Sequence, residues 1–73
     1  MPGIHKLIEV VGTSPESFAE AVRNAVDEAG KSVRRMEWFE VIEMRGRIAN
    51  NQLAEYQVKV KIGFKLERST EGK

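Results

Sequence analysis

The chain has 73 residues, no cysteine and one histidine, which leaves room for a single domain and excludes disulfides, thiolate metal sites and thiol nucleophiles. Its 12 basic and 11 acidic residues give a net charge of +1, which argues against a dedicated nucleic-acid binder. A core this small usually needs an additional source of stability, and with disulfides and metals set aside we expect oligomerisation.

No apolar run approaches the roughly 18 residues that span a bilayer. The first residues, MPGIHKLIEVV, lack the long apolar core of a secretory signal. We therefore expect a cytoplasmic protein that does not contact membranes.

The first predicted element is a strand over Ile4–Val11, which is rich in β-branched and apolar residues. Its apolar residues fall on both faces, so we expect burial on both sides. His5 is a lone strand histidine near a terminus, and we expect it to be solvated and not to bind a ligand.

Gly12-Thr13-Ser14-Pro15 predicts a turn and the start of a helix, with Ser14 capping the first turn and Pro15 at the first helical position. The helix ends at Gly30 or continues to about Ser32, since glycine weakens the last turns by roughly 1 kcal/mol against alanine. We expect this helix to cover a sheet and to take no part in chemistry. Its apolar stripe consists of Phe18, Val22, Ala25, Val26, Ala29 and Val33.

Two long strands follow. The first, over residues 34–48 (RRMEWFEVIEMRGRI), carries the only tryptophan and mixes apolar with charged groups on both faces. Asn50-Asn51 predicts a two-residue hairpin turn, because asparagine tolerates the left-handed backbone region. The second strand, Leu53–Glu67, alternates cleanly between apolar and polar residues, and residues 68–73 contain no apolar residue and are expected to be loose. The apolar face of the second strand consists of Ala54, Tyr56, Val58, Val60, Ile62, Phe64 and Leu66.

The two-residue turn predicts the pairing of the long strands, with Trp38 opposite Gly63 and Met44 opposite Gln57. A three-residue turn would invert the two faces. We favour the first register because it gives the helix a coherent apolar surface that includes Phe39 and Val41. The face away from the helix then carries Trp38, Ile42, Met44, Gln57 and Gly63.

An exposed tryptophan needs a cover, since large exposed apolar patches usually mark interaction sites. Two covers remain open from the pattern alone. One is another subunit, and the other is a flat ligand that stacks on Trp38 while Gln57 meets its polar edge. Gly63 leaves space above the sheet for either.

The segments VGTSPES, MEWFEVIEMRG and EYQVKVKIGFKLE closely resemble the dodecins, small flavin-binding proteins, and the resemblance covers about residues 5–67. It implies an α+β fold of the order β-α-β-β, with a three-stranded antiparallel sheet wrapped around one helix and an assembly into a hollow dodecamer. The whole chain, 1–73, is then one domain with an ordered core over about 4–67.

The resemblance also implies pockets between subunits, each holding flavin rings between symmetry-related tryptophans. Trp38 is the matching indole, and Gln57 matches the glutamine that hydrogen-bonds the flavin edge. Arg45 matches an arginine near the flavin side chain, which favours FMN over riboflavin because a guanidinium grips a phosphate with two bonds. Riboflavin and FAD remain the alternative ligands. Lys65 stands where some relatives carry arginine and keeps the charge without the forked geometry, while Gly63 leaves the indole room.

Arg45 conflicts with the predicted register, which points it to the helix side. Either a bulge near Gly46 redirects it, or it reaches the pocket of a neighbouring subunit. Some bacterial dodecins also bind coenzyme A on the outer surface. The basic residues that could serve here, or could equally be solvated charges at a helix end, are Lys31, Arg34 and Arg35.

The leading interpretation is a flavin storage and sequestration protein in which Trp38 quenches the photoexcited ring, and not an enzyme, because no nucleophile–base pair is apparent. One alternative is a self-assembling shell that uses Trp38 only as an interface anchor. The other is a small RNA-binding sheet that stacks bases on Trp38 and Tyr56, against which the balanced charge argues. Its phosphate contacts would come from Arg34, Arg35, Arg45 and Arg47.

Overall fold

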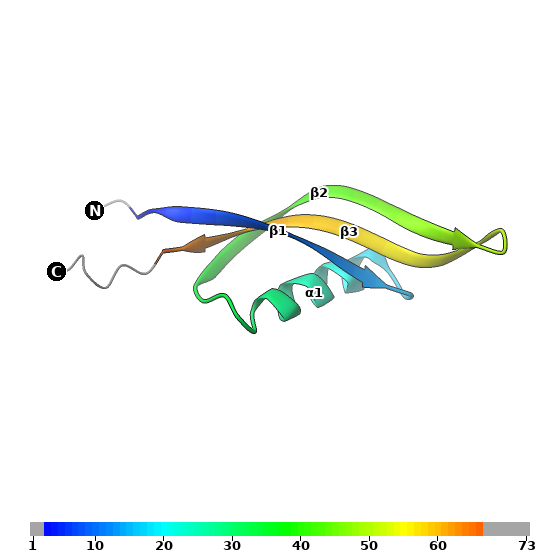
Figure 1. Cartoon of the computed structure of the whole chain (residues 1–73), viewed down its shortest axis with the longest axis horizontal. Helices are drawn as coiled ribbons and strands as arrows, with labels where there is room; N and C mark the ends of the chain where they lie inside the picture. The colour runs from blue at the N-terminus through cyan, green and yellow to red at the C-terminus, as the bar shows by residue number, and fades with distance from the viewer. Residues whose placement is uncertain (1–2, 67–73) are drawn as a thin grey trace.

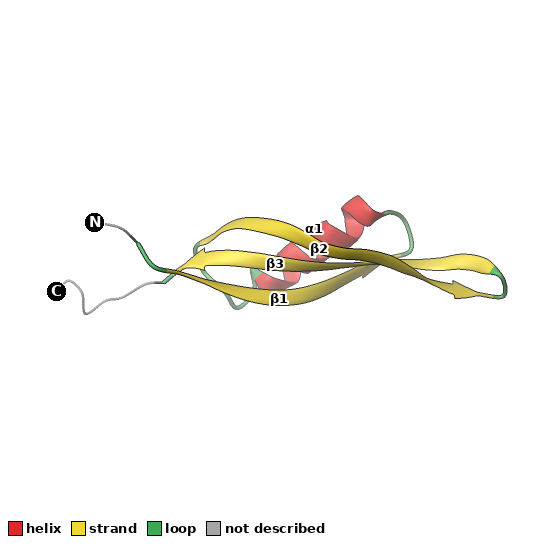
Figure 2. Cartoon of the chain, turned by 90° about the horizontal axis from the view of Figure 1, so that it is seen from above, coloured by secondary structure: helices red, strands yellow, loops and turns green. Residues whose placement is uncertain are grey.

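The computed structural model describes residues 3–66. Figure 1 shows the four elements in chain order: β1 (His5–Ser14), α1 (Phe18–Ala29), β2 (Met36–Ala49) and β3 (Gln52–Lys65). The strands form one antiparallel sheet in the order β1-β3-β2, and α1 lies on one face of it (Figure 2). The predicted β-α-β-β fold is therefore confirmed. The predicted loose tail, residues 68–73, lies outside the described residues.

β1 is longer than predicted, because Gly12 and Thr13 continue the strand and do not form a turn. Gly12 pairs with Val58 of β3. A Cβ atom at Gly12 would overlap the carbonyl oxygen of Ala21 and approach the Cβ of Ala25 to 2.8 Å. Glycine is needed here because the helix backbone packs directly on the strand.

The helix also begins later than predicted. Ser17 is the capping residue, and its Oγ accepts a hydrogen bond from the Glu20 amide at 3.0 Å. Ser14, which was expected to cap the helix, is buried at the end of β1 and accepts a hydrogen bond from the Glu16 amide at 2.8 Å. Pro15 therefore lies in the connection and not at the first helical position.

The core is thin and lies between α1 and the sheet. The helix ends at Ala29, which agrees with the earlier of the two predicted ends, at Gly30. The amide of Gly30 donates to the Val26 carbonyl at 2.9 Å. Small side chains on the helix allow a close approach to β1 and β3. The buried apolar residues among those described are Ala21, Ala25, Ala29, Val58, Val60 and Ile62.

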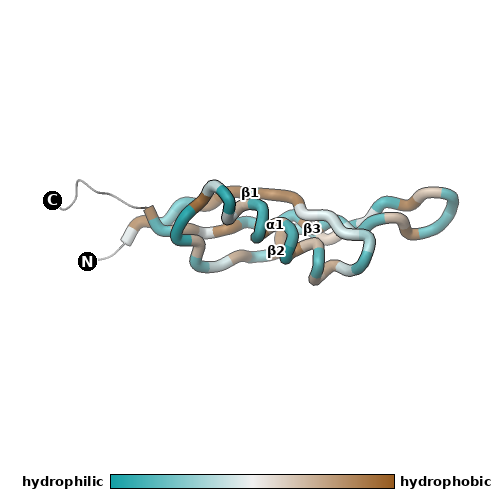
Figure 3. Tube along the Cα trace, turned by 90° about the horizontal axis from the view of Figure 1, so that it is seen from below, coloured by the Kyte–Doolittle hydropathy of each residue, from teal (hydrophilic) through white to brown (hydrophobic). Residues whose placement is uncertain are grey.

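The hairpin between β2 and β3 extends beyond the end of the helix (Figure 1). Figure 3 shows apolar and polar residues alternating along it. Asn50 and Asn51 have φ values of 54° and 60°, as expected for a two-residue turn that matches the twist of the strands. The predicted pairing of Trp38 with Gly63 is confirmed.

Over residues 43–47 of β2 the pairing with β3 is shifted by one residue from the predicted register. Ala54 is an extra residue in β3 near the hairpin, and Ile42 is an extra residue in β2. Between the two bulges Arg45 pairs with Gln57, and Met44 pairs with Val58. The predicted pairing of Met44 with Gln57 is therefore wrong, and Met44 lies on the helix side.

The helix leaves much of β2 uncovered. Phe39 and Val41 lie on the helix side as predicted, but they are 48% and 44% exposed because α1 packs mainly on β1 and β3. Together with Phe18, Val22 and Met44 they line an open groove between the helix and β2. The sheet therefore offers apolar surface on both faces of this strand.

The chain is too extended to be a self-sufficient domain. Its Cα radius of gyration is 15.4 Å, whereas a compact domain of this length has about 11 Å. Ten large hydrophobic residues of the described segment are exposed, whereas its buried apolar residues number six and three of these are alanines. No helix in the described segment is long and apolar enough to cross a bilayer.

Candidate functional site

The candidate site lies on the sheet face opposite the helix, which we call the open face. Its residues are those that share a face with Gly63, Lys61, Lys59 and Gln57 of β3. Antiparallel partners project to the same side of a sheet, so the register decides which β2 residues join them. These β2 residues are Trp38, Glu40, Glu43, Arg45 and Arg47.

Trp38 lies flat against the backbone of β3. A Cβ atom at Gly63 would overlap the Cζ2 and Cε2 atoms of the indole, so any other residue at this position would push the ring away. Trp38 nevertheless remains 44% exposed. The indole therefore packs directly on Gly63. The sequence predicted free space above this glycine, whereas the ring of Trp38 occupies that space.

His5 contacts Trp38 from β1. The two ring centroids are 5.2 Å apart and the planes are inclined by 54°. The Nε2 atom of His5 lies 2.8 Å from the Oε1 atom of Glu37 in β2. His5 is exposed, as expected, but it is not isolated, because Glu37 and Trp38 of β2 contact it across the intervening strand β3.

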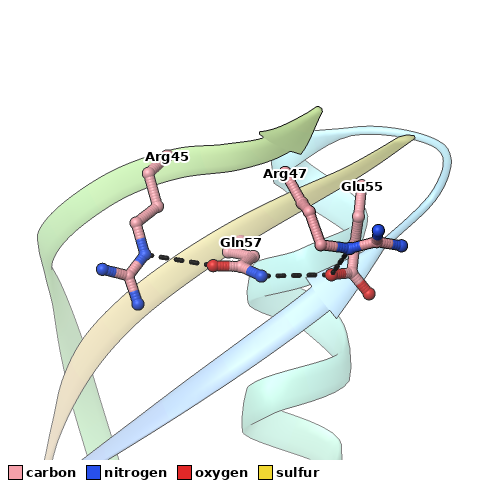
Figure 4. A network of polar contacts seen from close by, with 4 residues as sticks. All are labelled: Arg45, Arg47, Glu55 and Gln57. Carbon is pink, nitrogen blue, oxygen red and sulfur yellow. Dashed lines mark hydrogen bonds and ion pairs between the residues drawn. The ribbon is translucent and has the colours of Figure 1, made fainter. Parts of the chain in front are cut away.

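Arg45 and Gln57 lie at the other end of the open face, towards the hairpin. The Nε atom of Arg45 donates a hydrogen bond to Oε1 of Gln57 at 3.0 Å (Figure 4). The sequence left two explanations for Arg45, a bulge near Gly46 or a neighbouring pocket. The bulge is confirmed, since the register shift between Arg47 and Ile48 turns Arg45 to the open face.

A third and a fourth side chain extend this contact into a polar network. Gln57 Nε2 donates to Glu55 Oε1 at 3.1 Å, and Arg47 Nε lies 3.6 Å from the same oxygen (Figure 4). The sequence reasoning missed Glu55 as a site residue. Its signal was available, because Glu55 stands two residues before Gln57 and therefore on the same face of the strand.

The structure does not bring Trp38 and Gln57 together within one chain. Gly63, which carries the indole, is six residues from Gln57 along β3, and this spacing corresponds to about 20 Å. A flat ligand stacked on Trp38 cannot reach the Gln57 amide of the same copy. A pocket in which one flavin meets both side chains therefore requires two copies of the chain.

Lys65 lies at the Trp38 end of the open face. It pairs with His5 in the register, and its backbone amide donates to the Arg35 carbonyl at 3.0 Å. The ammonium group is thus far from Arg45 and closer to the indole. Among the described residues no group of three or more histidine, aspartate or glutamate side chains is arranged to hold a metal ion.

Comparison with known proteins places this geometry in one family. The family model for Dodecin matches residues 4–67. A dodecin of Thermus thermophilus is 42% identical over 69 residues, which cover 94% of this chain and 100% of the relative. The structure of a dodecin from Streptomyces davaonensis matches with a TM-score of 0.89 at 37% identity, covering 93% of this chain and 100% of the other.

A third relative, from Mycobacterium tuberculosis, is named calcium dodecin and is 32% identical over 63 residues, covering 86% of this chain and 89% of the relative. The family model covers nearly the whole described segment, and the structural match covers all three strands and the helix. The chain belongs to the dodecin family.

Proposed function

We propose that this protein binds a flavin by stacking its ring system on Trp38. The family to which the chain belongs consists of small flavin-binding proteins. The observation that carries the proposal is the indole that lies across Gly63 and stays 44% exposed. One face of that ring is supported by the strand, so a planar ligand fits against the other.

The binding site is composite, because one copy cannot supply both contacts. Trp38 and Gln57 are about 20 Å apart along the strands of a single chain. A flavin on Trp38 of one copy would therefore meet Gln57 and Arg45 of a neighbouring copy. This assignment also gives Arg45 its role, since its terminal guanidinium nitrogens extend beyond the bond to Gln57.

Assembly is part of the same proposal. The exposed apolar side chains on both faces of β2 and the extended shape of the monomer favour a homo-oligomer. We propose the dodecamer implied by the family. In such an assembly the ligand would be enclosed between copies, and the chain would store and sequester flavin, not transform it.

The chemistry of the indole suits this task. Trp38 is electron-rich and the flavin ring is electron-poor, so stacking adds about 0.5–1.5 kcal/mol to the contribution of the buried area. An indole held against the ring would also donate an electron to its photoexcited state and quench it. FMN is the favoured form because Arg45 can bind its phosphate. Coenzyme A on Lys31, Arg34 and Arg35, and a cytoplasmic location, are secondary proposals.

A titration tests the proposal. Adding the purified protein to FMN should quench flavin fluorescence, and flavin absorbance should coincide with the oligomer peak in size-exclusion chromatography. Trp38→Ala should weaken the affinity at least about tenfold, since both stacking and buried area are lost. Asp27→Ala, an exposed substitution on α1 away from the open face, is the control and should bind as the wild type does. Unchanged FMN affinity in Trp38→Ala would refute the proposal.

A further inference from the structure

We propose that Glu55 is a positioning residue that fixes the direction of the Gln57 amide and thereby sets where the polar edge of the ligand is bound along the strands. This inference rests on the proposed flavin function. Glu55 does not need to touch the ligand. It acts through one hydrogen bond, from Gln57 Nε2 to Glu55 Oε1 at 3.1 Å.

The direction of the Gln57 amide follows from its two partners. A guanidinium group only donates hydrogen bonds and an ionised carboxylate only accepts them. Arg45 Nε therefore requires the amide oxygen on its side, and Glu55 requires the amide nitrogen on the other. Turning the amide round would place donor against donor and acceptor against acceptor, so both contacts would be lost together.

The bulge at Ala54 builds this arrangement. Ala54 shifts the register so that Arg47 stands opposite Glu55, and Arg45 opposite Gln57. Glu55 is 29% exposed in its side chain and lies 3.6 Å from the Arg47 guanidinium, whose side chain is 58% exposed. Arg47 thus neutralises the carboxylate without competing for the amide. Figure 4 shows the four side chains in one row across the two strands.

The fixed amide leaves a defined pattern for a ligand. One hydrogen on Nε2 and one lone pair on Oε1 remain after the internal contacts are made. They present a donor on the Glu55 side and an acceptor on the Arg45 side. The imide edge of a flavin has an N–H between two carbonyl oxygens, so its N–H can donate to Oε1 while one of the carbonyls accepts from Nε2. The fixed amide therefore sets where this edge lies along the strands.

A double-mutant cycle separates this role from a structural one. The affinity for FMN is measured in the wild type, Glu55→Ala, Gln57→Ala and the double variant. Glu55→Ala should weaken binding about three- to tenfold, as expected when one oriented hydrogen bond is lost. In the Gln57→Ala background the same change should have no effect, because nothing remains to be oriented. Asp27→Ala removes an exposed carboxylate from α1, on the other side of the sheet, and should bind as the wild type does.

The outcomes distinguish this inference from the proposed function. If the wild type binds no FMN, the proposed function fails. If the wild type binds and Glu55→Ala is unchanged, or is equally weakened in both backgrounds, the positioning role is refuted while flavin binding stands. Should Glu55→Ala not assemble, the cycle is run with Glu55→Gln, whose amide can accept or donate and no longer enforces one direction. Its smaller loss should again vanish in the Gln57→Ala background, and equal losses would overturn the inference.

Discussion

The composite site makes a prediction that a site within one chain does not. Trp38→Ala and Gln57→Ala each remove one half of the proposed pocket. Mixing the two variants in one assembly leaves some pockets with an intact indole from one chain and an intact amide from another. With equal amounts and random assembly, about one quarter of the pockets should regain both side chains. A site formed within one chain would regain none, because every chain lacks one residue.

The distance that excludes a site within one chain follows from the strand geometry. Gly63 and Gln57 are six residues apart on β3, so the two contacts are separated by about 20 Å in one copy. A tricyclic ring cannot span that distance. No bulge in β3 shortens it, because the extra residue Ala54 lies outside the segment from Gln57 to Gly63.

The assay is a stoichiometric titration with FMN, followed by the quenching of flavin fluorescence. Co-expressed chains carrying different affinity tags are purified through both tags, so that only mixed assemblies are measured. The two single variants, prepared separately and mixed after purification, are the control. Tight binding restored to about one quarter of the wild-type stoichiometry is expected. Mixed assemblies that bind no better than either single variant would refute the composite site.

Three further predictions concern the surroundings of the indole and the core. Gly63→Ala should lower FMN affinity about as far as Trp38→Ala does, because the new Cβ would overlap the indole; titration checks this. Gly12→Ala should lower stability by about 1–3 kcal/mol through overpacking against Ala21, measured as a lower thermal midpoint at fixed protein concentration. His5→Leu should change the emission of Trp38, the only tryptophan, because the His5 ring lies 5.2 Å from the indole. An emission spectrum identical to that of the wild type would show that this contact does not affect the indole.

The order of elements and the hairpin could be predicted because they follow from local patterns. The alternation of β3 and the asparagine pair fix the turn, and the turn fixes the pairing of Trp38 with Gly63. The exact helix start could not be predicted, since Ser14 and Ser17 are both suitable caps. The structure selects Ser17 because Ser14 is held in β1 by pairing with Tyr56.

The bulges could not be predicted with the rest of the hairpin, and the sequence indicated one near Gly46 only as one of two explanations for Arg45. The apolar and charged residues of β2 are mixed on both faces, so a one-residue shift changes no clear hydrophobic pattern. Whether Ile42 and Ala54 are paired or extra depends on contacts between strands, which a single strand does not reveal. The predicted register pointed Arg45 to the helix side because it did not include this shift.

Stability and ligand binding use the same surface in this chain. The buried core supplies little, because half of its apolar residues are alanines, while Trp38 and the helix side of β2 remain open. If the pocket forms only between copies, a bound flavin stabilises the assembly and not the monomer. A ligand at a hundred times its dissociation constant then adds about 2.7 kcal/mol to each occupied site. The exposed indole, which would be a liability in a monomer, is on this view the residue that couples assembly to flavin binding.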